Sequence, residues 1–386
     1  MEKPLRKLRI TGKGRCNLTN NCSNDDFLLK VKSGVDFFGY SLENFSTSDT
    51  IEYFKRIGLK LTTDRGGRVF PASMKSGDVA NYLESAVKRN GGVIRCKSKV
   101  VNIFPKKEGG YKVTYLSQNK KMIVEADTVV IATGGASYPS TGSTGDGYKF
   151  AKSLGHSVIT PRPSLVPLNI DCKHLKSLNR LLLKNIQLTI NIDGRRAAEQ
   201  FGELEFFDYG VGGATLLKVS RDAVDAINNK KNVEISIDLK PALSESKLQG
   251  RIERELSSDA NLTTSSLLRK LVPSSLTKVI EERLSFRAAA KITTLNSSSR
   301  KELIDTLKNL KFKVTGYEGF EKAIITAGGV ALESVNHQTM QSQKRDGIYI
   351  IGELLDLDAD TGGYNLQIAF STAHTAAMHI SEVLKK

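Results

Sequence analysis

One stretch near the end of the chain, Gly347 to Phe370, has the residue types and spacing of a ligand-binding turn. Its β-branched and aromatic run, Ile348 to Ile351, is typical of a buried strand. The acidic turn Gly352-Glu353 follows, and Gly362-Gly363 then precedes an apolar-periodic segment, Tyr364 to Ala377. Unpaired amides at such a helix start carry the positive end of the helix dipole and stabilise electron-rich ligand atoms. The alternative is a last core strand with a surface glutamate, because folds reuse such turns without a ligand.

Two earlier segments also end on glycine turns. Ile10 to Asn20 is predicted to be a short strand entering a Gly- and Asn-rich turn, where Arg15 and Asn17 offer donors in fixed geometry. On its own this segment is better explained as a tight turn that happens to be basic. Thr128 to Gly135 is an apolar strand ending in small residues, as expected for a central parallel strand covered on both faces. It stops where a ligand could lie.

Composition sets the class of protein. With 386 residues, the chain is long enough for two domains or for one domain with a large insertion. No run approaches the ~18 apolar residues of a membrane span, and the N-terminus lacks the apolar centre of a secretory signal. We therefore expect a cytoplasmic protein without membrane partners. The cysteines have no zinc-like spacing, so no metal site is expected.

The net charge of +16 raises a nucleic-acid hypothesis, since Lys and Arg neutralise phosphates. The basic residues are dispersed, however, in short pairs such as Lys106-Lys107 and Arg195-Arg196. No basic stripe interleaved with aromatic residues, of the kind that stacks bases, is found in the sequence. A solvated basic surface is therefore favoured over a nucleic-acid partner.

The order of predicted elements indicates one α/β domain interrupted by an insertion. Helices are predicted over 46–61, 76–89 and 298–310, and strands over 93–96, 100–104, 111–116 and 122–124. Alternation over 185–193 and 233–239, with the turn signal Asp193-Gly194, predicts antiparallel strands, and 245–287 predicts helices. Ala323 to Val330 then repeats the apolar strand that closes on glycines. We expect a binding domain at 1–164 and 323–386, with a β-rich and helical insertion at 165–322.

Five segments, taken together and in order, resemble the YhiN/BaiN-like family of FAD-dependent oxidoreductases, some members of which are labelled aminoacetone-oxidase-like. The segments are ITGKGRCNLTN, TVVIATGGASYPSTGSTGDGY, LVPL, ITAGGVAL and GIYIIGELLDLDADTGGYNLQIAFS. The resemblance covers nearly the whole chain. It implies an α/β fold with an FAD/NAD(P)-binding Rossmann-like domain, FAD as cofactor, and an inserted β-rich and helical domain.

The resemblance also implies where FAD would be bound. Arg15, Cys16 and Asn17 would lie near the flavin, and Val100 near the adenine. Ala132, Thr133, Gly134 and Gly135 would lie along the cofactor, and Gly352 with Glu353 would face its ribityl and pyrophosphate part. The segment under the isoalloxazine ring would comprise Thr361, Gly362, Gly363, Tyr364 and Asn365. These are strand ends and helix starts, where open parallel sheets bind ligands.

One departure from the flavoprotein pattern concerns the phosphates. A G-x-G-x-x-G fingerprint on a first strand-helix turn is absent, because Gly12-Lys13-Gly14 lacks the third glycine and Gly142 to Gly147 is mis-spaced. Either Met1 is an internal methionine mistaken for the start, or the chain lacks a pyrophosphate-binding loop. Losing that loop would remove amides and a helix dipole from a doubly charged group. We therefore expect the chain as given to be weakly folded or flavin-free.

The predicted function is FAD-dependent oxidation or reduction of a small organic substrate, with NAD(P)H as a candidate partner. The alternative is a non-catalytic binding protein, either a truncated or flavin-less remnant or a basic RNA-associated module. No catalytic acid or base is identified, because the histidines are isolated in the sequence. Tyr138, Tyr364 and Asn365 are polar candidates near the ring, although core packing or capping explains them equally well. The sequence leaves the substrate, the direction of transfer and the oligomeric state open.

Overall fold

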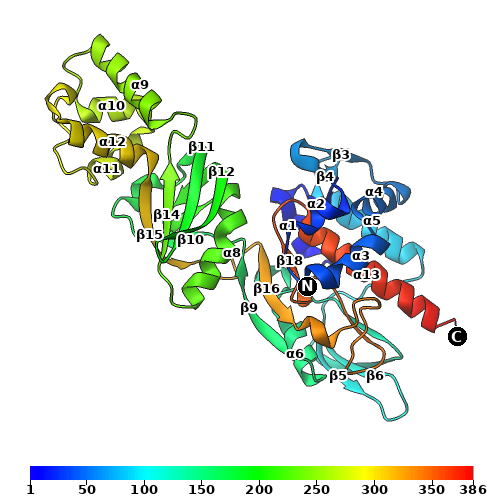
Figure 1. The fold of residues 1–386 in the computed structure, drawn as a ribbon. Helices are drawn as coiled ribbons and strands as arrows, with labels where there is room; N and C mark the ends of the chain where they lie inside the picture. The colour runs from blue at the N-terminus through cyan, green and yellow to red at the C-terminus, as the bar shows by residue number, and fades with distance from the viewer. Residues whose placement is uncertain (386) are drawn as a thin grey trace. The chain divides into compact units, whose positions relative to one another are not determined.

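The computed structural model describes residues 1–385, which form two compact units. Unit 1 comprises Met1–Pro163 and Phe320–Lys386, and unit 2 comprises Ser164–Gly319. Unit 1 is therefore built from both ends of the chain, and unit 2 from one continuous segment between them (Figure 1). No helix among the described residues is long and apolar enough to cross a membrane.

A parallel strand pair lies in the core of unit 1. β8 (Val129–Ile131) pairs with β17 (Ile348–Ile350), with Val129 opposite Ile348 and Ile131 opposite Ile350. β17 is fully buried, as its apolar run predicts. The prediction that the earlier strand is covered on both faces is wrong at Val130, which is 40% exposed. The physical reason is that β8, among the described strands, pairs with β17 alone and so has an open edge.

Helices cover this core, and α13 (Tyr364–Val383) is one that the apolar periodicity predicts, whereas α3 (Val35–Asn44) is not. α13 begins at the expected glycine pair and runs beside α3 (Figure 1). Phe27 packs between Phe38 and Tyr364, with ring centroids 5.7 and 5.0 Å away. The remaining helices of unit 1 are α1 (Arg6–Gly14), α2 (Asn24–Leu28), α4 (Thr47–Arg56), α5 (Ser76–Arg89) and α6 (Asp146–Ser153).

The short strands of unit 1 form small sheets around the parallel pair. The predicted meander is confirmed as β5 (Ser98–Pro105), β6 (Tyr111–Ser117) and β7 (Lys120–Ala126), all antiparallel. β16 (Ile325–Val330) pairs with β9 (Val158–Ser164). The others are β1 (Thr19–Asn20), β2 (Val31–Ser33), β3 (Leu61–Thr63), β4 (Arg68–Pro71) and β18 (Asp358–Ala359).

Two predicted strands of unit 1 are wrong. Residues 93–96 contain no strand; Val93 is 77% exposed there, so its apolar side chain is not buried in a sheet. The Ile10-Thr11 segment lies in α1, which departs from helical dihedrals only at Thr11, Gly12 and Lys13. Leu8 of α1 is buried with Val79 and Ala80 of α5, and this packing overrides the weak local strand preference.

Unit 2 is a closed antiparallel barrel with helices around it. The strand order is β10-β13-β12-β11-β14-β15, and β15 pairs with β10 to close it. The predicted hairpin is confirmed: Asp193 and Gly194 have φ values of 49° and 79° and join the paired residues Ile192 and Arg195. The barrel strands are β10 (Leu168–Ile170), β11 (Leu182–Ile192), β12 (Arg195–Phe207), β13 (Gly210–Gly212), β14 (Val233–Asp238) and β15 (Leu310–Tyr317).

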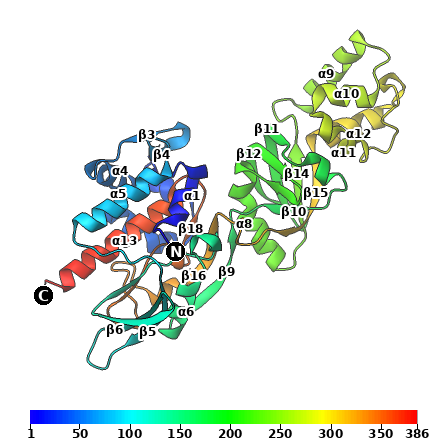
Figure 2. The same ribbon diagram turned by 180° about the vertical axis from the view of Figure 1, so that it is seen from behind.

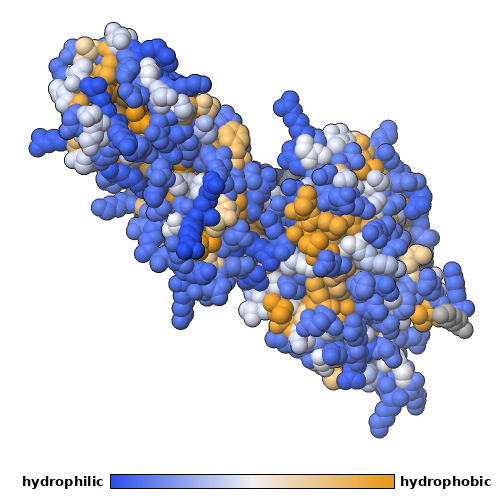
Figure 3. Space-filling model, in the orientation of Figure 1, coloured by the Kyte–Doolittle hydropathy of each residue, from blue (hydrophilic) through white to orange (hydrophobic). Residues whose placement is uncertain are grey.

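The helices of unit 2 cover the barrel and complete its core. α8 (Ala214–Asn228) packs against β11 and β12 (Figure 2). The other helices are α7 (Leu175–Leu178), α9 (Glu245–Ser258), α10 (Thr264–Leu271), α11 (Ser274–Glu281) and α12 (Ser297–Lys308). Figure 3 shows a largely hydrophilic face on unit 2, as expected when the apolar residues fill one internal core.

The barrel core gives a stability prediction. Ile190 of β11 is completely buried, so Ile190→Ala should lower the free energy of unfolding of unit 2 by about 2–5 kcal/mol. Hydrogen exchange of the β11 and β14 amides in the full chain would measure this change. Phe201→Ala, on the neighbouring strand β12, is the control because Phe201 is 54% exposed. A smaller effect for Ile190→Ala than for Phe201→Ala would contradict the barrel packing.

Candidate active site

A close approach of the Gly135 backbone to the Thr326 side chain shapes the turn that follows β8. A Cβ atom on Gly135 would lie 2.4 Å from Thr326 Oγ1, so only glycine allows this approach. Thr326, on β16, is fully buried, and its hydroxyl oxygen accepts hydrogen bonds from the amides of Ala136 (2.8 Å) and Ser137 (3.1 Å). The turn after β8 is therefore fixed against β16.

Glu353 lies beside this turn and joins four segments of unit 1. Its carboxylate accepts from the Thr326 amide (2.9 Å), the Ser137 hydroxyl (3.2 Å) and the Lys7 ammonium (2.5 Å). Lys7 Nζ also donates to Ser137 Oγ at 2.7 Å. We call Lys7, Ser137, Thr326 and Glu353 the Glu353 group. The side chains of Lys7 and Glu353 are only 22% and 19% exposed, so solvent screens their attraction less than at an open surface.

Tyr148 of α6 lies close enough to Glu353 for the carboxylate charge to change the pKa of the tyrosine. Burial, and then the Glu353 charge, raise the pKa of Tyr148 above its usual value of 10.0. Both effects disfavour the phenolate. Tyr148 therefore contributes a neutral hydroxyl rather than a negative charge beside Glu353.

A second close approach brings the N-terminus of α13 against β1. Gly363 has a φ of 98°, and a Cβ atom there would lie 2.5 Å from the carbonyl oxygen of Thr19. Asn20 donates to the Gly66 (3.0 Å) and Gly362 (3.2 Å) carbonyl oxygens, and the Thr19 hydroxyl donates to Gln367 Oε1 (2.6 Å). These contacts hold the segment after Asn17 at the start of α13.

Tyr364 and Asn365 have structural partners at this helix start. Burial raises the pKa of Tyr364 to about 12, and its ring packs in the core against Phe27. The Asn365 side chain accepts from the Ala359 amide (3.0 Å) and donates to the Ala359 and Asp360 carbonyl oxygens (2.8 and 3.1 Å). Core packing and loop fixation thus explain both residues without a ligand.

Three predicted site residues, Arg15, Cys16 and Asn17, follow α1 directly. They differ in which of their polar groups could still bind a ligand. The Arg15 guanidinium lies 5.0 Å from the Phe70 ring centroid and donates to the Gly12 carbonyl oxygen at 3.2 Å. The Asn17 Oδ1 atom is buried without a hydrogen-bond partner among the described residues. A buried acceptor of this kind is costly unless a donor reaches it. The N3–H of an isoalloxazine ring is a suitable donor, so this observation fits a bound flavin.

The predicted site residues are only partly brought together. Gly134, Gly135, Gly352 and Glu353 meet beside Lys7, whereas Thr361 to Asn365 lie at the start of α13 next to the segment that follows Asn17. α1 connects the two places, because Lys7 and Gly12 to Arg15 are on or directly after it. Val100 pairs with Tyr115 in the meander, and the exposed residues Ala132 and Thr133 follow β8. Whether all these residues bind FAD stays a prediction.

Sequence reasoning missed the side chains that complete the Glu353 group. Lys7 lies in a basic segment without a motif, so nothing in its spacing identified it. Ser137 begins the Ser-, Gly- and Thr-rich loop that follows β8, and Thr326 lies in the strand that ends on glycines. Those two segments were recognised, but the hydroxyl groups that point to Glu353 were not.

The histidines all have partners that explain their positions. His156 is buried, and its two ring nitrogens lie 2.8 Å from the hydroxyls of Ser334 and Ser342. Burial lowers the pKa of His156, which favours the neutral ring. The other contacts are His174 with Glu282, His337 with Phe37 and Tyr40, His374 with Phe45, and His379 with Tyr349. Ring packing or hydrogen bonds thus account for the positions of the five rings, and His374 Nδ1 is the one ring nitrogen among them that is buried without a hydrogen-bond partner in the described residues.

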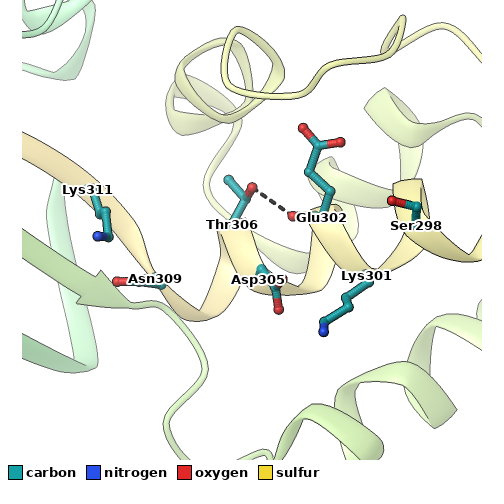
Figure 4. Close-up of a pocket in the computed structure, with 7 residues that line it drawn as sticks. All are labelled: Ser298, Lys301, Glu302, Asp305, Thr306, Asn309 and Lys311. Carbon is teal, nitrogen blue, oxygen red and sulfur yellow. Dashed lines mark hydrogen bonds between the residues drawn. The ribbon is translucent and has the colours of Figure 1, made fainter.

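A depression of about 480 Å³ lies on unit 2, and none of the predicted site residues line it (Figure 4). The Glu302 carboxylate already accepts from the amide and hydroxyl of Ser285, at 2.7 and 2.6 Å. Thr306 donates to the Glu302 carbonyl oxygen at 2.8 Å. The lining residues are Ser298, Lys301, Glu302, Asp305, Thr306, Asn309 and Lys311. These bonds fix α12 and its neighbours rather than form a second active site.

The fold and the site define a Rossmann-like α/β protein of the flavin-binding type, with an inserted barrel. The particular family follows from comparison: the chain belongs to the HI0933-like protein Rossmann domain family, which matches residues 1–379. The resemblance seen in the sequence is thereby confirmed, as is the fold class. The expectations of an FAD-dependent oxidoreductase and of FAD as cofactor are confirmed at the level of the family.

Three relatives show how far the similarity extends. The 3-dehydro-bile acid delta(4,6)-reductase of Clostridium scindens is 29% identical over 385 residues, which are 98% of this chain and 90% of that protein. The ribosomal RNA dihydrouridine synthases of Haemophilus influenzae and Escherichia coli are each 27% identical, over 97% and 98% of this chain and 90% of each relative. The similarity therefore includes both units.

Solved flavoenzyme structures are more distant. Aklavinone-11 hydroxylase, in a complex with FAD and aklavinone, is 11% identical with a TM-score of 0.30, over 84% of this chain and 43% of that one. BexE is 9% identical with a TM-score of 0.33, over 98% of this chain and 59% of that one.

The buried thiol at the site gives a reactivity prediction. Burial raises the pKa of Cys16 from its usual 9.0 to about 11, although a hydrogen bond with Thr11 opposes the shift. At pH 7 the thiolate fraction is then on the order of 1 in 10⁴, so alkylation in the folded protein should be slow. The thiol of the unfolded chain ionises at a lower pH than the buried thiol of the folded protein. The contribution of Cys16 to the free energy of unfolding should therefore fall as the pH rises from 9 towards 11.

Thiol titration with and without urea would test this prediction. The Cys16→Ser variant identifies the slow thiol, because it should remove one slowly reacting group from the folded protein. Equal rates for Cys16 before and after unfolding would refute a buried, protonated thiol.

Gly363 gives a prediction about the second close approach. Gly363→Ala forces a side chain into a left-handed backbone and against Thr19, at a cost of about 1–3 kcal/mol for the backbone alone. Urea unfolding of unit 1 should show the loss. Gly39→Ala in α3 is the matched control, because nothing lies within 4 Å of its Cβ position and alanine favours a helix. Equal stability of the two variants would argue against the packing of α13 on β1.

Proposed function

We propose that this protein is an FAD-dependent reductase of carbon–carbon double bonds conjugated to a carbonyl group. The buried, unpartnered Asn17 Oδ1 carries the proposal, because it lies next to Arg15 in the segment held at the start of α13 and fits the N3–H of a flavin. The names of the relatives support the reaction class. A delta(4,6)-reductase of a 3-dehydro bile acid and a dihydrouridine synthase both describe hydrogen addition to a double bond conjugated to a carbonyl.

The roles of the residues follow from their contacts. FAD, when bound, would supply the hydride for the alkene carbon. Asn17 would orient the ring through its free amide oxygen. Arg15, which has no carboxylate partner among the described residues, would stabilise negative charge near the ring, and its stacking on Phe70 fixes the guanidinium there.

The source of the hydride and the protein's location belong to the same proposal. A flavin that reduces an alkene must itself be reduced, and NAD(P)H is the hydride donor that we propose. A cytoplasmic location, where NAD(P)H is available, is part of this proposal. The identity of the proton donor stays open.

Two classes of substrate fit this reaction. The first is a small enone or dienone carrying an acidic group, in keeping with the bile-acid relative. The second is uridine in RNA, which two relatives and the net charge of +16 favour. The sequence itself favoured a small molecule over nucleic acid, so the small enone is the first candidate.

The functional prediction is a flavin spectrum followed by substrate-dependent reoxidation. Although the missing G-x-G-x-x-G loop should weaken binding, the chain supplied with FAD should show a bound-flavin band near ~450 nm that bleaches with NAD(P)H in the absence of oxygen. A 3-oxo-4-ene steroid acid should then restore the band; for the RNA alternative, incubated ribosomal RNA would gain about 2 Da at one uridine. Absence of bound flavin, after FAD is added in excess and the unbound FAD is removed by gel filtration, would refute the enzyme. Retention of FAD without oxidation by either substrate would refute the reaction class.

A further inference from the structure

We propose that Lys7 is a phosphate-binding residue for FAD. When FAD binds, the Lys7 ammonium would leave its ion pair with Glu353 and pair with the pyrophosphate of the cofactor instead. The inference rests on the proposed flavin function and extends it to a residue with no predicted role. It also addresses the missing G-x-G-x-x-G fingerprint, because a lysine supplies charge where loop amides usually supply hydrogen bonds.

The position of Lys7 favours this role. Lys7 is on α1, yet its Nζ atom reaches the turn after β8 at Ser137 and the turn after β17 at Glu353. Both turns belong to segments that the family resemblance assigns to the cofactor. Since parallel strands bind ligands at their carboxyl ends, Lys7 lies at the edge of the sheet where a phosphate is expected.

The number of N–H donors on the Lys7 ammonium also favours a phosphate-binding role. A lysine ammonium has three N–H donors, and the contacts to Glu353 and Ser137 use two. The side chain is partly buried but still 22% exposed, so an incoming anion can reach the third donor. The flexible stem of lysine allows the ammonium to change partner without moving α1.

The Glu353 carboxylate would still be hydrogen-bonded after Lys7 leaves it. It keeps two other donors, the Thr326 amide at 2.9 Å and the Ser137 hydroxyl at 3.2 Å. It can therefore stay in place when Lys7 turns to a phosphate. The exchange would also free one carboxylate oxygen to accept a hydrogen bond from a ribityl hydroxyl.

Two flavins that differ in phosphate separate this role from a structural ion pair. FAD and riboflavin share the ring and ribityl chain, but only FAD carries pyrophosphate. Dissociation constants for both would be measured by fluorescence titration with the full chain, its Lys7→Met and Lys7→Arg variants, and Lys55→Met. Lys55 is the control because it is exposed on α4 of the same unit and its replacement removes the same charge.

The expected result is selective for the phosphate. Lys7→Met should weaken FAD binding about tenfold to a hundredfold and riboflavin binding less than about twofold, as loss of a charged hydrogen bond predicts. Lys7→Arg should retain most FAD affinity, and Lys55→Met should leave both flavins unaffected. FAD binding should also depend less on salt in Lys7→Met than in the unaltered protein.

Three outcomes would overturn the proposal. Equal weakening of FAD and riboflavin would mean that Lys7 only positions Glu353. Unchanged FAD affinity in Lys7→Met, with an unchanged thermal midpoint of the flavin-free protein, would make the ion pair a surface contact without a binding role. Failure of the unaltered protein to bind either flavin would remove the proposed function as well, whereas the first two outcomes leave it standing.

Discussion

The site of unit 1 depends on glycines whose backbones lie so close to neighbouring segments that no side chain would fit. Gly135 lies against Thr326, and Gly363 lies against Thr19. Gly329 makes a third such contact, because its Cβ position is 2.6 Å from the Leu354 carbonyl oxygen. Each contact joins a strand or helix end to another segment. Together they set the distances over which Lys7, Glu353 and Asn20 can make their hydrogen bonds.

Around these contacts, some polar side chains are fully hydrogen-bonded or packed within the protein, whereas others have a polar atom without a partner. Asn365 and Tyr364 are satisfied by the protein itself, whereas Asn17 Oδ1 has no partner among the described residues. The Arg15 guanidinium similarly lies on an aromatic ring rather than in an ion pair. Polar side chains near a glycine turn are thus not equivalent, and the unsatisfied ones carry the argument for a ligand.

Much of the fold could be predicted from the sequence, because apolar periodicity and turn residues are local signals. The α5 helix, the β5–β7 meander and the Asp193-Gly194 hairpin were found in this way. The exposure of Val130 could not be, since it depends on which strands pair with β8. The same limit applies to the site: its glycines were recognised by type and spacing, whereas Lys7 meets Glu353 only through tertiary folding.

The division of unit 1 between the two ends of the chain has a consequence for synthesis. β8 can pair with β17 only after the last part of the chain has left the ribosome, while every strand of the barrel precedes β16. The barrel is therefore the first unit whose long-range contacts can all form, since pairing must wait for both partners. Until then the apolar strand β8 is without its partner, so the nascent N-terminal segment cannot complete its sheet.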